Sequence, residues 1–457
     1  MDKKHIQHLY WRAGFGLNPQ ELSIQENKNR SDLIDELFLK SAKPKPLIVN
    51  TSEFNRFNSK MLNTNKEARK EFNKLNTSKI NELNYSWIYR LVNSDQILRE
   101  KMTLFWSNHF VCRDNNIIAT QKYNNTLRKY ALGNFKDFVK AISKESAMIK
   151  YLNLNQNIKR KPNENFAREL LELFTLGIGN YSEKDIKEAA RAFTGYKTNL
   201  KAKFIFKKNQ HDTGLKTFLN RKDNFNGDQI IDVILEEKQC SKFICEKIYA
   251  YFVNENLNVE HIESMANVFY KNYNIEELIR FVFSSDWFYN KDNIGSKIKS
   301  PIEFLVGMHK VIPLKFNSRK ELLKMQSVLN QKLLFPPNVA GWQGGRHWIT
   351  TNSILVRVKL PSMILERESY SIKPKGDFTK TFQFAYVKNK FQDKLDVSVD
   401  WKSYKKNVKK LKSEEFLSSL ILCNVTPGTE KYLKSIGRLT KKRNLVKIMS
   451  LPEYQMC

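Results

Sequence analysis

Residues 182–195, SEKDIKEAARAFTG, contain the local signals that decide the fold class. Ser182 is a typical helix N-cap, Asp185 completes an approximate capping box with it, and Gly195 is typical of a helix end. Apolar residues between them recur every three or four positions, as on the buried face of an amphipathic helix. The same period, with Ser31 as the expected N-cap of its first segment, predicts helices at residues 31–40, 228–237, 241–252, 261–272, 275–284, 302–311, 319–331 and 353–366.

Signals for β-strands are scarce, so the predicted fold class is mostly α. Residues 196–206 and 216–219 alternate polar and apolar side chains around Asn-rich turns, which predicts a small β-hairpin inserted between helices. A polar stretch with Pro and Gly, residues 369–380, is the best candidate boundary. We therefore expect a large multi-helix body over residues 1–368 and a basic helical C-terminal part over 381–457, packed together as one continuous unit.

The chain has 457 residues, 41% of them hydrophobic, and a formal net charge of +31. This composition is too apolar for a disordered chain, and five scattered cysteines do not form a disulfide scaffold. Lys outnumbers Arg, whereas specific nucleic-acid readers depend on the Arg fork, so we do not expect specific nucleic-acid binding. No stretch reaches the ~20 apolar residues of a membrane helix, and no secretory signal is visible, so the expected location is cytoplasmic.

Polar side chains are densest in residues 163–177, NENFARELLELFTLG. On a regular helix Glu164, Arg168 and Glu172 fall on one stripe, with Glu169 beside it. One interpretation is a solvated face laced by ion pairs, each contributing only ~0.2–0.5 kcal/mol. The other is a pocket wall on which a Glu acts as acid or base while Arg168 holds an anionic group.

Two shorter segments offer groups that complete such a pocket. Asn108 and His109 lie side by side in an aromatic segment, where a core histidine is the simpler interpretation. His211, Asp212 and Lys216 lie at the end of the predicted hairpin, and turns often display functional groups. No HExxH or paired CxxC spacing is present, so neither a divalent metal nor another cofactor has a supporting motif.

Residues 335–352, FPPNVAGWQGGRHWITTN, combine two Pro, three Gly and two Trp, which predicts a rigid loop rather than a helix. Trp342 and Trp348 are candidates for stacking on a sugar or base ring, although packing over the helical core explains them equally well. Near the start, Arg12 precedes a Gly-Phe-Gly turn, but no phosphate-binding glycine motif is present.

Short blocks along the chain carry a resemblance to a known family: HLYWRAGFG (8–16), FWSNHF (105–110), NENFARELLELFTLG (163–177), KDIKEAARAFTGY (184–196), HDTGLKTFL (211–219), KSPIEFL (299–305), FPPNVAGWQGG (335–345), HWITTN (347–352) and LPEYQ (451–455). Together they resemble a bacterial family catalogued as domain of unknown function 1800 (DUF1800). Each block alone is weak, but the combination is specific and covers nearly the whole chain. The resemblance implies one mostly helical unit.

The resemblance implies no established reaction. Members of the family are often predicted to be exported and often occur beside a second family related to sulfatases and alkaline phosphatases. Export is therefore the alternative location, and a sulfatase-like protein is a candidate partner. The resemblance also favours a shared polar site built from the landmark residues Arg12, Asn108, His109, Glu164, Arg168, Glu169, Glu172, His211, Asp212 and Lys216.

Our first hypothesis is an enzyme with a polar pocket that acts by hydrolysis or elimination on an anionic glycan or a related ester. Glu164 or Glu169 is the expected acid or base, and His211, oriented by Asp212, is a second proton-transfer group. We expect these groups to meet Arg168 in one pocket, with substrate binding by Arg12, Asn108, His109, Arg168, Glu172, Lys216, Trp342 and Trp348. The alternatives are a non-catalytic binding protein that serves a sulfatase-like partner, and non-specific nucleic-acid binding through the basic surface.

Overall fold

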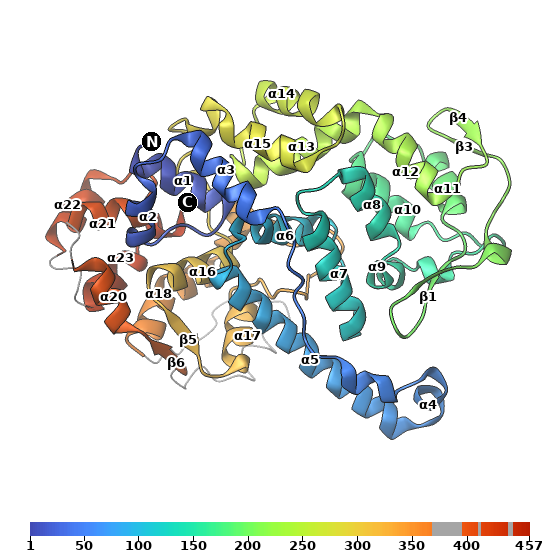
Figure 1. The fold of residues 1–457 in the computed structure, drawn as a ribbon, viewed down its shortest axis with the longest axis horizontal. Helices are drawn as coiled ribbons and strands as arrows, with labels where there is room; N and C mark the ends of the chain where they lie inside the picture. Colours follow the sequence, from blue (N-terminus) through green and yellow to red (C-terminus); the bar gives the residue numbers. More distant parts are fainter. Residues whose placement is uncertain (368–394, 410–412, 437–441) are drawn as a thin grey trace.

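The computed structural model describes residues 1–367, 395–409, 413–436 and 442–457, and it is predominantly helical (Figure 1). This confirms the predicted fold class. The helices of the N-terminal half are α1 Lys3–Ala13, α2 Pro19–Gln25, α3 Arg30–Ser41, α4 Ser59–Thr64, α5 Lys66–Asn93, α6 Ile97–His109, α7 Ile117–Tyr130, α8 Phe135–Ser143, α9 Ser146–Tyr151, α10 Asn165–Glu169 and α11 Glu183–Ala192. Those that follow are α12 Gly227–Glu236, α13 Lys238–Phe252, α14 Val259–Tyr270, α15 Ile275–Ser284, α16 Pro301–Val311, α17 Arg319–Val328, α18 Thr351–Leu365, α20 Trp401–Val408, α21 Ser413–Leu420, α22 Pro427–Ser435 and α23 Lys442–Met449.

The β-strands of the described residues form three antiparallel pairs, and a few isolated β-bridges lie outside them. The pairs are β1 Tyr196–Thr198 with β2 Phe204–Phe206, β3 Lys216–Phe218 with β4 Arg221–Asp223, and β5 Leu314–Phe316 with β6 Val397–Val399. The single hairpin predicted between 196 and 219 is thus two hairpins. The β5–β6 pair was not predicted, because its strands are distant in sequence and no local turn links them.

Helix capping confirms one prediction and corrects another. The Ser182 side chain accepts from the backbone N–H of Asp185, and the Asp185 carboxylate accepts from the N–H of Ser182, which forms the predicted capping box of α11. Helix α3 begins earlier than predicted, because the Asn29 side chain accepts from the N–H of Asp32 (2.9 Å). Asn and Ser cap equally well, so the local pattern did not distinguish Asn29 from Ser31.

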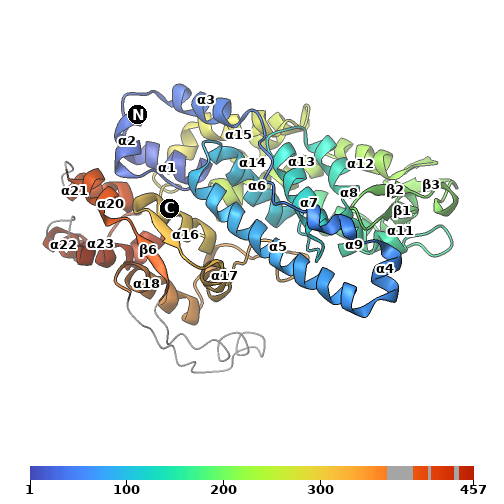
Figure 2. The same cartoon turned by 60° about the horizontal axis from the view of Figure 1, so that its bottom comes forward.

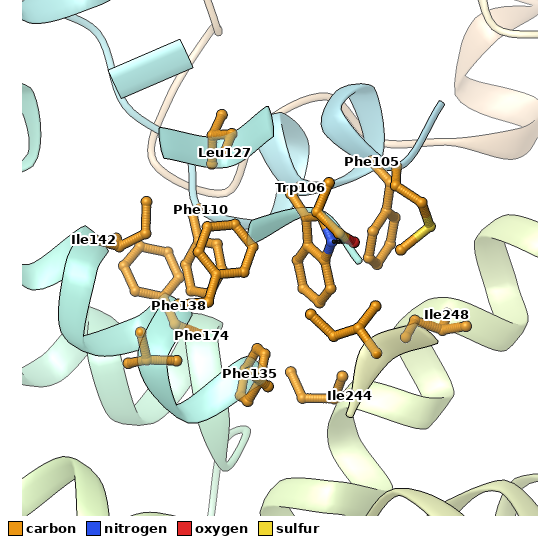
Figure 3. Packing of buried hydrophobic residues seen from close by; sticks show 14 of the residues in the cluster. Phe105, Trp106, Phe110, Leu127, Phe135, Phe138, Ile142, Phe174, Ile244 and Ile248 are labelled. Carbon is orange, nitrogen blue, oxygen red and sulfur yellow. Dashed lines mark hydrogen bonds between the residues drawn. The ribbon is translucent and has the colours of Figure 1, made fainter. Parts of the chain in front are cut away.

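The largest hydrophobic core is centred on aromatic residues of α6 and α8 (Figure 3). The rings of Trp106 and Phe110 both meet Phe138 edge to face, with centroids 5.3 and 4.9 Å apart. The indole N–H of Trp106 donates to the carbonyl of Ala131 (3.1 Å), so the buried ring leaves no polar atom unsatisfied. This packing fixes the C-terminal turn of α6, which carries Asn108 and His109.

A second core joins α16 and α18 to the C-terminal helices, over residues from Phe304 to Tyr454. The candidate boundary at 369–380 lies outside the described residues, and the division into 1–368 and 381–457 stays a prediction. Helices α20–α23 lie at one end of the molecule and the β1–β2 hairpin at the other (Figures 1 and 2). Among the described residues, no helix has both the length and the apolar character needed to cross a membrane.

Candidate functional site

The segment 163–177 is not the single regular helix that its sequence predicts. It continues from α10 into a π-helical turn, Leu170–Thr175, in which the backbone N–H of Leu176 donates to Leu171 across five residues (2.9 Å). A π-turn advances less per residue around the axis than an α-turn. Glu172 is therefore displaced from the stripe on which it was predicted.

Arg168 forms a surface ion-pair cluster. Its guanidinium donates to Glu183 at the start of α11 (2.8 and 2.9 Å) and to Glu164 one turn earlier (3.3 Å). Hydrogen bonds to Glu183 raise the pKa of Arg168, although its side chain is 37% exposed. An exposed cluster of this kind adds little to stability, because solvent screens the charges. Its geometry matches the solvated-face interpretation.

Glu169 and Glu172 lie beside this cluster in partly buried positions. Burial raises the pKa of Glu169, and the neighbouring Glu172 adds to the shift. Glu172 also accepts a hydrogen bond from the hydroxyl of Tyr181 (3.2 Å).

The His211–Lys216 turn is bound to α11. Asp212 accepts two hydrogen bonds from Arg191 (2.8 and 3.2 Å), and the His211 ring lies 2.9 Å from the carbonyl oxygen of Thr194. Burial acts to raise the pKa of Asp212, but the bonds from Arg191 and the Gly214 N–H lower it below its ordinary value. Asp212 therefore positions the turn. It forms no hydrogen bond with the His211 ring, so it does not orient that ring.

Lys216 is buried, and its ammonium is used within the same turn. It donates to the carbonyl oxygens of Asp212 (2.8 Å) and Gly214 (2.9 Å) and to the side chain of Asn224 (3.2 Å). With its three N–H groups occupied, Lys216 holds the turn closed.

Two of the predicted site residues, Arg168 and Asp212, bind different ends of α11. Arg168 binds Glu183 in its first turn, whereas Asp212 binds Arg191 in its last. Eight residues of α-helix separate the two anchors by ~12 Å. No hydrogen bond or ion pair within the described ranges links Arg168 or Glu169 to His211 or Asp212.

A cleft of about 440 Å³ lies where α6, the π-helical turn, α13 and the loop 339–345 meet. Three predicted binding residues, Asn108, His109 and Trp342, line it. The predicted residues on α10 and in the 211–216 turn do not. The remaining polar side chains of the lining, Lys247, Tyr251, Gln343, Glu255 and Lys297, were not predicted.

Asn108 holds the loop against α6. Its amide accepts from the backbone N–H of Trp342 (2.8 Å) and donates to the Trp342 carbonyl (2.9 Å). Gly341 adopts a positive φ of +77°, and a Cβ there would overlap the Asn108 side chain. Glycine is therefore required at position 341, because the backbone there lies too close to Asn108 for any larger side chain. Trp348, also predicted, is buried in the short turn Gly345–Trp348 and is not among the lining residues.

His109 is a neutral polar group at the wall of the cleft. Burial, with a smaller contribution from Lys247, lowers its pKa to about 3. Its Nε2 lies 3.0 Å from the carbonyl oxygen of Phe174, so Nε2 carries the proton and Nδ1 is the basic nitrogen.

Lys297 and Glu255 bring opposite charges to the cleft. The Lys297 ammonium donates to the carbonyl of Ala250 (2.6 Å) and lies 5.1 Å from the ring centre of Tyr251. Burial lowers the pKa of Lys297 to about 8, with a further contribution from Arg12. Glu255 approaches Gly345 so closely that a Cβ at that glycine would overlap its carboxylate. For two of these residues the sequence offered a signal. Lys247 and Tyr251 are four positions apart on a helix, so they lie on the same face.

Buried charge surrounds Lys297. Four further cations are buried near it: Arg12, Lys101, Lys299 and Arg357. The carboxylate of Glu303 is buried beside them. Glu303 accepts from Lys101, which holds the pKa of that carboxyl at about 2 despite its burial. Cations therefore exceed anions in this region, and the resulting positive potential favours an anion in the cleft.

Arg12 serves this region from a buried position. It is 2% exposed and donates to the carbonyl of Asn293 (2.9 Å) and the hydroxyl of Ser296 (3.3 Å). These bonds anchor the segment that leads to Lys297. Arg12 thus positions the cleft and does not line it.

No cluster of three His, Cys, Asp or Glu side chains suited to a metal ion occurs in the part of the chain that the structure describes. The sequence model of a family described as "Protein of unknown function (DUF1800)" matches residues 8–456. The chain therefore belongs to this family. Neither a curated protein nor a solved structure matches it.

Proposed function

We propose that the cleft binds an anionic, ring-containing ligand and acts on it by acid–base chemistry, as hydrolysis or elimination of an anionic glycan or a related ester. The observation that carries the proposal is the convergence of Lys247, Lys297 and Glu255 with the ring of Trp342 on one cleft. Its volume of about 440 Å³ is within the ~300–1,000 Å³ typical of small-molecule sites.

Each lining group has a role in this proposal. Lys247, exposed at the rim, holds a sulfate or carboxylate, and the Trp342 side chain contacts a ring. Lys297 and Glu255 transfer protons, since a Lys with a pKa near 8 is neutral in a much larger fraction of molecules at neutral pH than an ordinary Lys and can then accept a proton. This proposal assigns proton transfer to Lys297 and Glu255 in place of Glu164, Glu169, His211 and Asp212, which do not line the cleft.

The test begins with binding, measured by calorimetry with oligogalacturonates and with neutral oligosaccharides of equal length. We expect binding of the acidic oligomer alone, weakened at least ~tenfold by Lys247→Ala, because one charged hydrogen bond contributes ~1.5–3 kcal/mol. Lys238→Ala, an exposed Lys on the same helix, is the control. If both variants weakened binding equally, the cleft would not be the binding site.

Turnover is then followed by the appearance of reducing ends or of unsaturated uronate. Glu255→Gln keeps the shape of the side chain and should abolish turnover while binding is retained. Binding without any turnover in the unmodified protein would instead support the alternative, a non-catalytic accessory protein of a sulfatase-like partner.

A further inference from the structure

Two segments free of acidic residues lie side by side at the end of the molecule that carries the β1–β2 hairpin. Residues 146–163 and 192–211 contain no Asp or Glu. The N–H of Lys159 donates to the Gln210 carbonyl (2.9 Å), and the N–H of Gly195 donates to the Asn157 carbonyl (3.0 Å). Their exposed cations, hereafter the basic surface, are Lys159, Arg160, Lys161, Lys201, Lys203, Lys207 and Lys208.

These seven cations have no anionic partner. None forms an ion pair with a carboxylate in the described part of the chain. Two carboxylates of adjoining elements are bound by other lysines: Asp114 by Lys150 (3.0 Å) and Asp228 by Lys144 (2.6 Å). Helix α5 differs, because Glu67 and Glu71 alternate with its exposed Lys residues. The seven positive charges therefore repel one another, and binding of an external anion would relieve this repulsion.

The scaffold under the basic surface is fixed. Asn155 accepts from the backbone N–H of Thr198 (3.1 Å) and from the ammonium of Lys197, which joins the turn before Lys159 to strand β1. The β1–β2 pairing, from Tyr196 opposite Phe206 to Thr198 opposite Phe204, sets the spacing of Lys203 and Lys207. Because the backbone is already fixed, only the side chains of the basic surface lose conformational entropy when a ligand binds.

We propose that the basic surface binds a linear acidic polysaccharide. Its charges are six Lys and one Arg, point charges that suit dispersed carboxylates or sulfates rather than the bidentate base contacts that Arg makes. It exposes one aromatic ring, Phe206, whereas single-stranded nucleic acid is bound on successive stacking rings. One partly exposed ring also offers little apolar area for insertion into a membrane. The choice of a polysaccharide rests on the proposed function, whereas the unpaired charge does not.

The test compares two variants that remove the same charge. In Lys201→Gln/Lys203→Gln/Lys207→Gln/Lys208→Gln the basic surface loses four cations. The control, Lys60→Gln/Lys66→Gln/Lys70→Gln/Lys74→Gln, removes four exposed cations from α4 and α5. We expect polygalacturonate to bind the first variant roughly tenfold more weakly, with a reduced dependence on salt, and to bind the control like the unmodified chain.

Short oligogalacturonates separate this proposal from that of the cleft. Their binding should be unchanged in the basic-surface variant, since they fit the cleft alone, and weakened in Lys247→Ala. Equal loss of polymer binding in both fourfold variants would overturn the basic surface and leave the cleft untouched. Selective loss of binding to single-stranded DNA or to phosphatidylserine vesicles, with polygalacturonate binding unchanged, would overturn the choice of a polysaccharide.

Discussion

Lys297 is the residue at which stability and proposed function meet. A buried ammonium is costly unless it is compensated, and here it is compensated by one carbonyl, one aromatic face and Glu303 nearby. Burial and the neighbouring Arg12 lower its pKa from 10.5 to about 8. Burial also lowers the pKa of Lys299, two residues further along the chain, to about 8.

This pKa shift predicts a pH-dependent stability. Between pH 8 and 10.5 the Lys297 side chain binds more protons in the unfolded chain than in the folded protein, so the contribution of this group to the free energy of unfolding should rise with pH there. The rise is ~3 kcal/mol for a shift of this size, and Lys299 adds its own. Lys297→Met should remove this contribution, which appears as a pH-dependent difference between the two proteins in urea titrations at several pH values. An unchanged rise would contradict the burial of a titrating ammonium at this position.

At the scale of elements, the loop 339–345 is shaped by glycines that face side chains of other segments. Gly341 meets Asn108 of α6, and Gly345, at a φ of +61°, meets Glu255 beyond the end of α13. Gly344 lies between them with φ −83° and no atom near its missing Cβ. Backbone conformation and close approach therefore require glycine at 341 and 345 but not at 344.

Two neighbouring substitutions test this difference. Gly345→Ala should lower the free energy of unfolding by about 1–3 kcal/mol and weaken oligogalacturonate binding, because the new methyl group displaces Glu255 and strains the backbone. Gly344→Ala should change stability by less than ~0.5 kcal/mol. Chemical denaturation and calorimetry of both variants give the comparison, and equal effects would show that the loop does not hold Glu255.

At the scale of the whole molecule, the end of the chain supports the cleft. The backbone of Lys297 exchanges hydrogen bonds with Cys457 (2.7 and 3.2 Å), and the N–H of Lys299 donates to Gln455 (2.8 Å). Gln455 also accepts from the buried guanidinium of Arg357 (2.9 Å). The segment that carries Lys297 is thus held by residues 455–457.

Removal of residues 452–457 should therefore damage the cleft as well as the C-terminal core. We expect a lower Tm and at least ~tenfold weaker oligogalacturonate binding, since Lys297 loses its backbone partner. Gln455→Ala is the milder variant, which leaves the chain intact and removes the acceptor of Arg357. Retention of full affinity in the truncated, folded protein would show that the cleft does not depend on this segment.

The sequence by itself determined the helical class, the α11 capping box and the loop around Trp342, because each depends on interactions within a few residues. It also indicated Asn108, His109 and Trp342, which the structure brings to one cleft. Only the tertiary structure decided that Arg168 and Asp212 bind opposite ends of α11, and that Lys247, Glu255 and Lys297 face Trp342. Local periodicity places a side chain on a face of its own helix. Which distant charge meets that face depends on packing between segments that are remote in sequence.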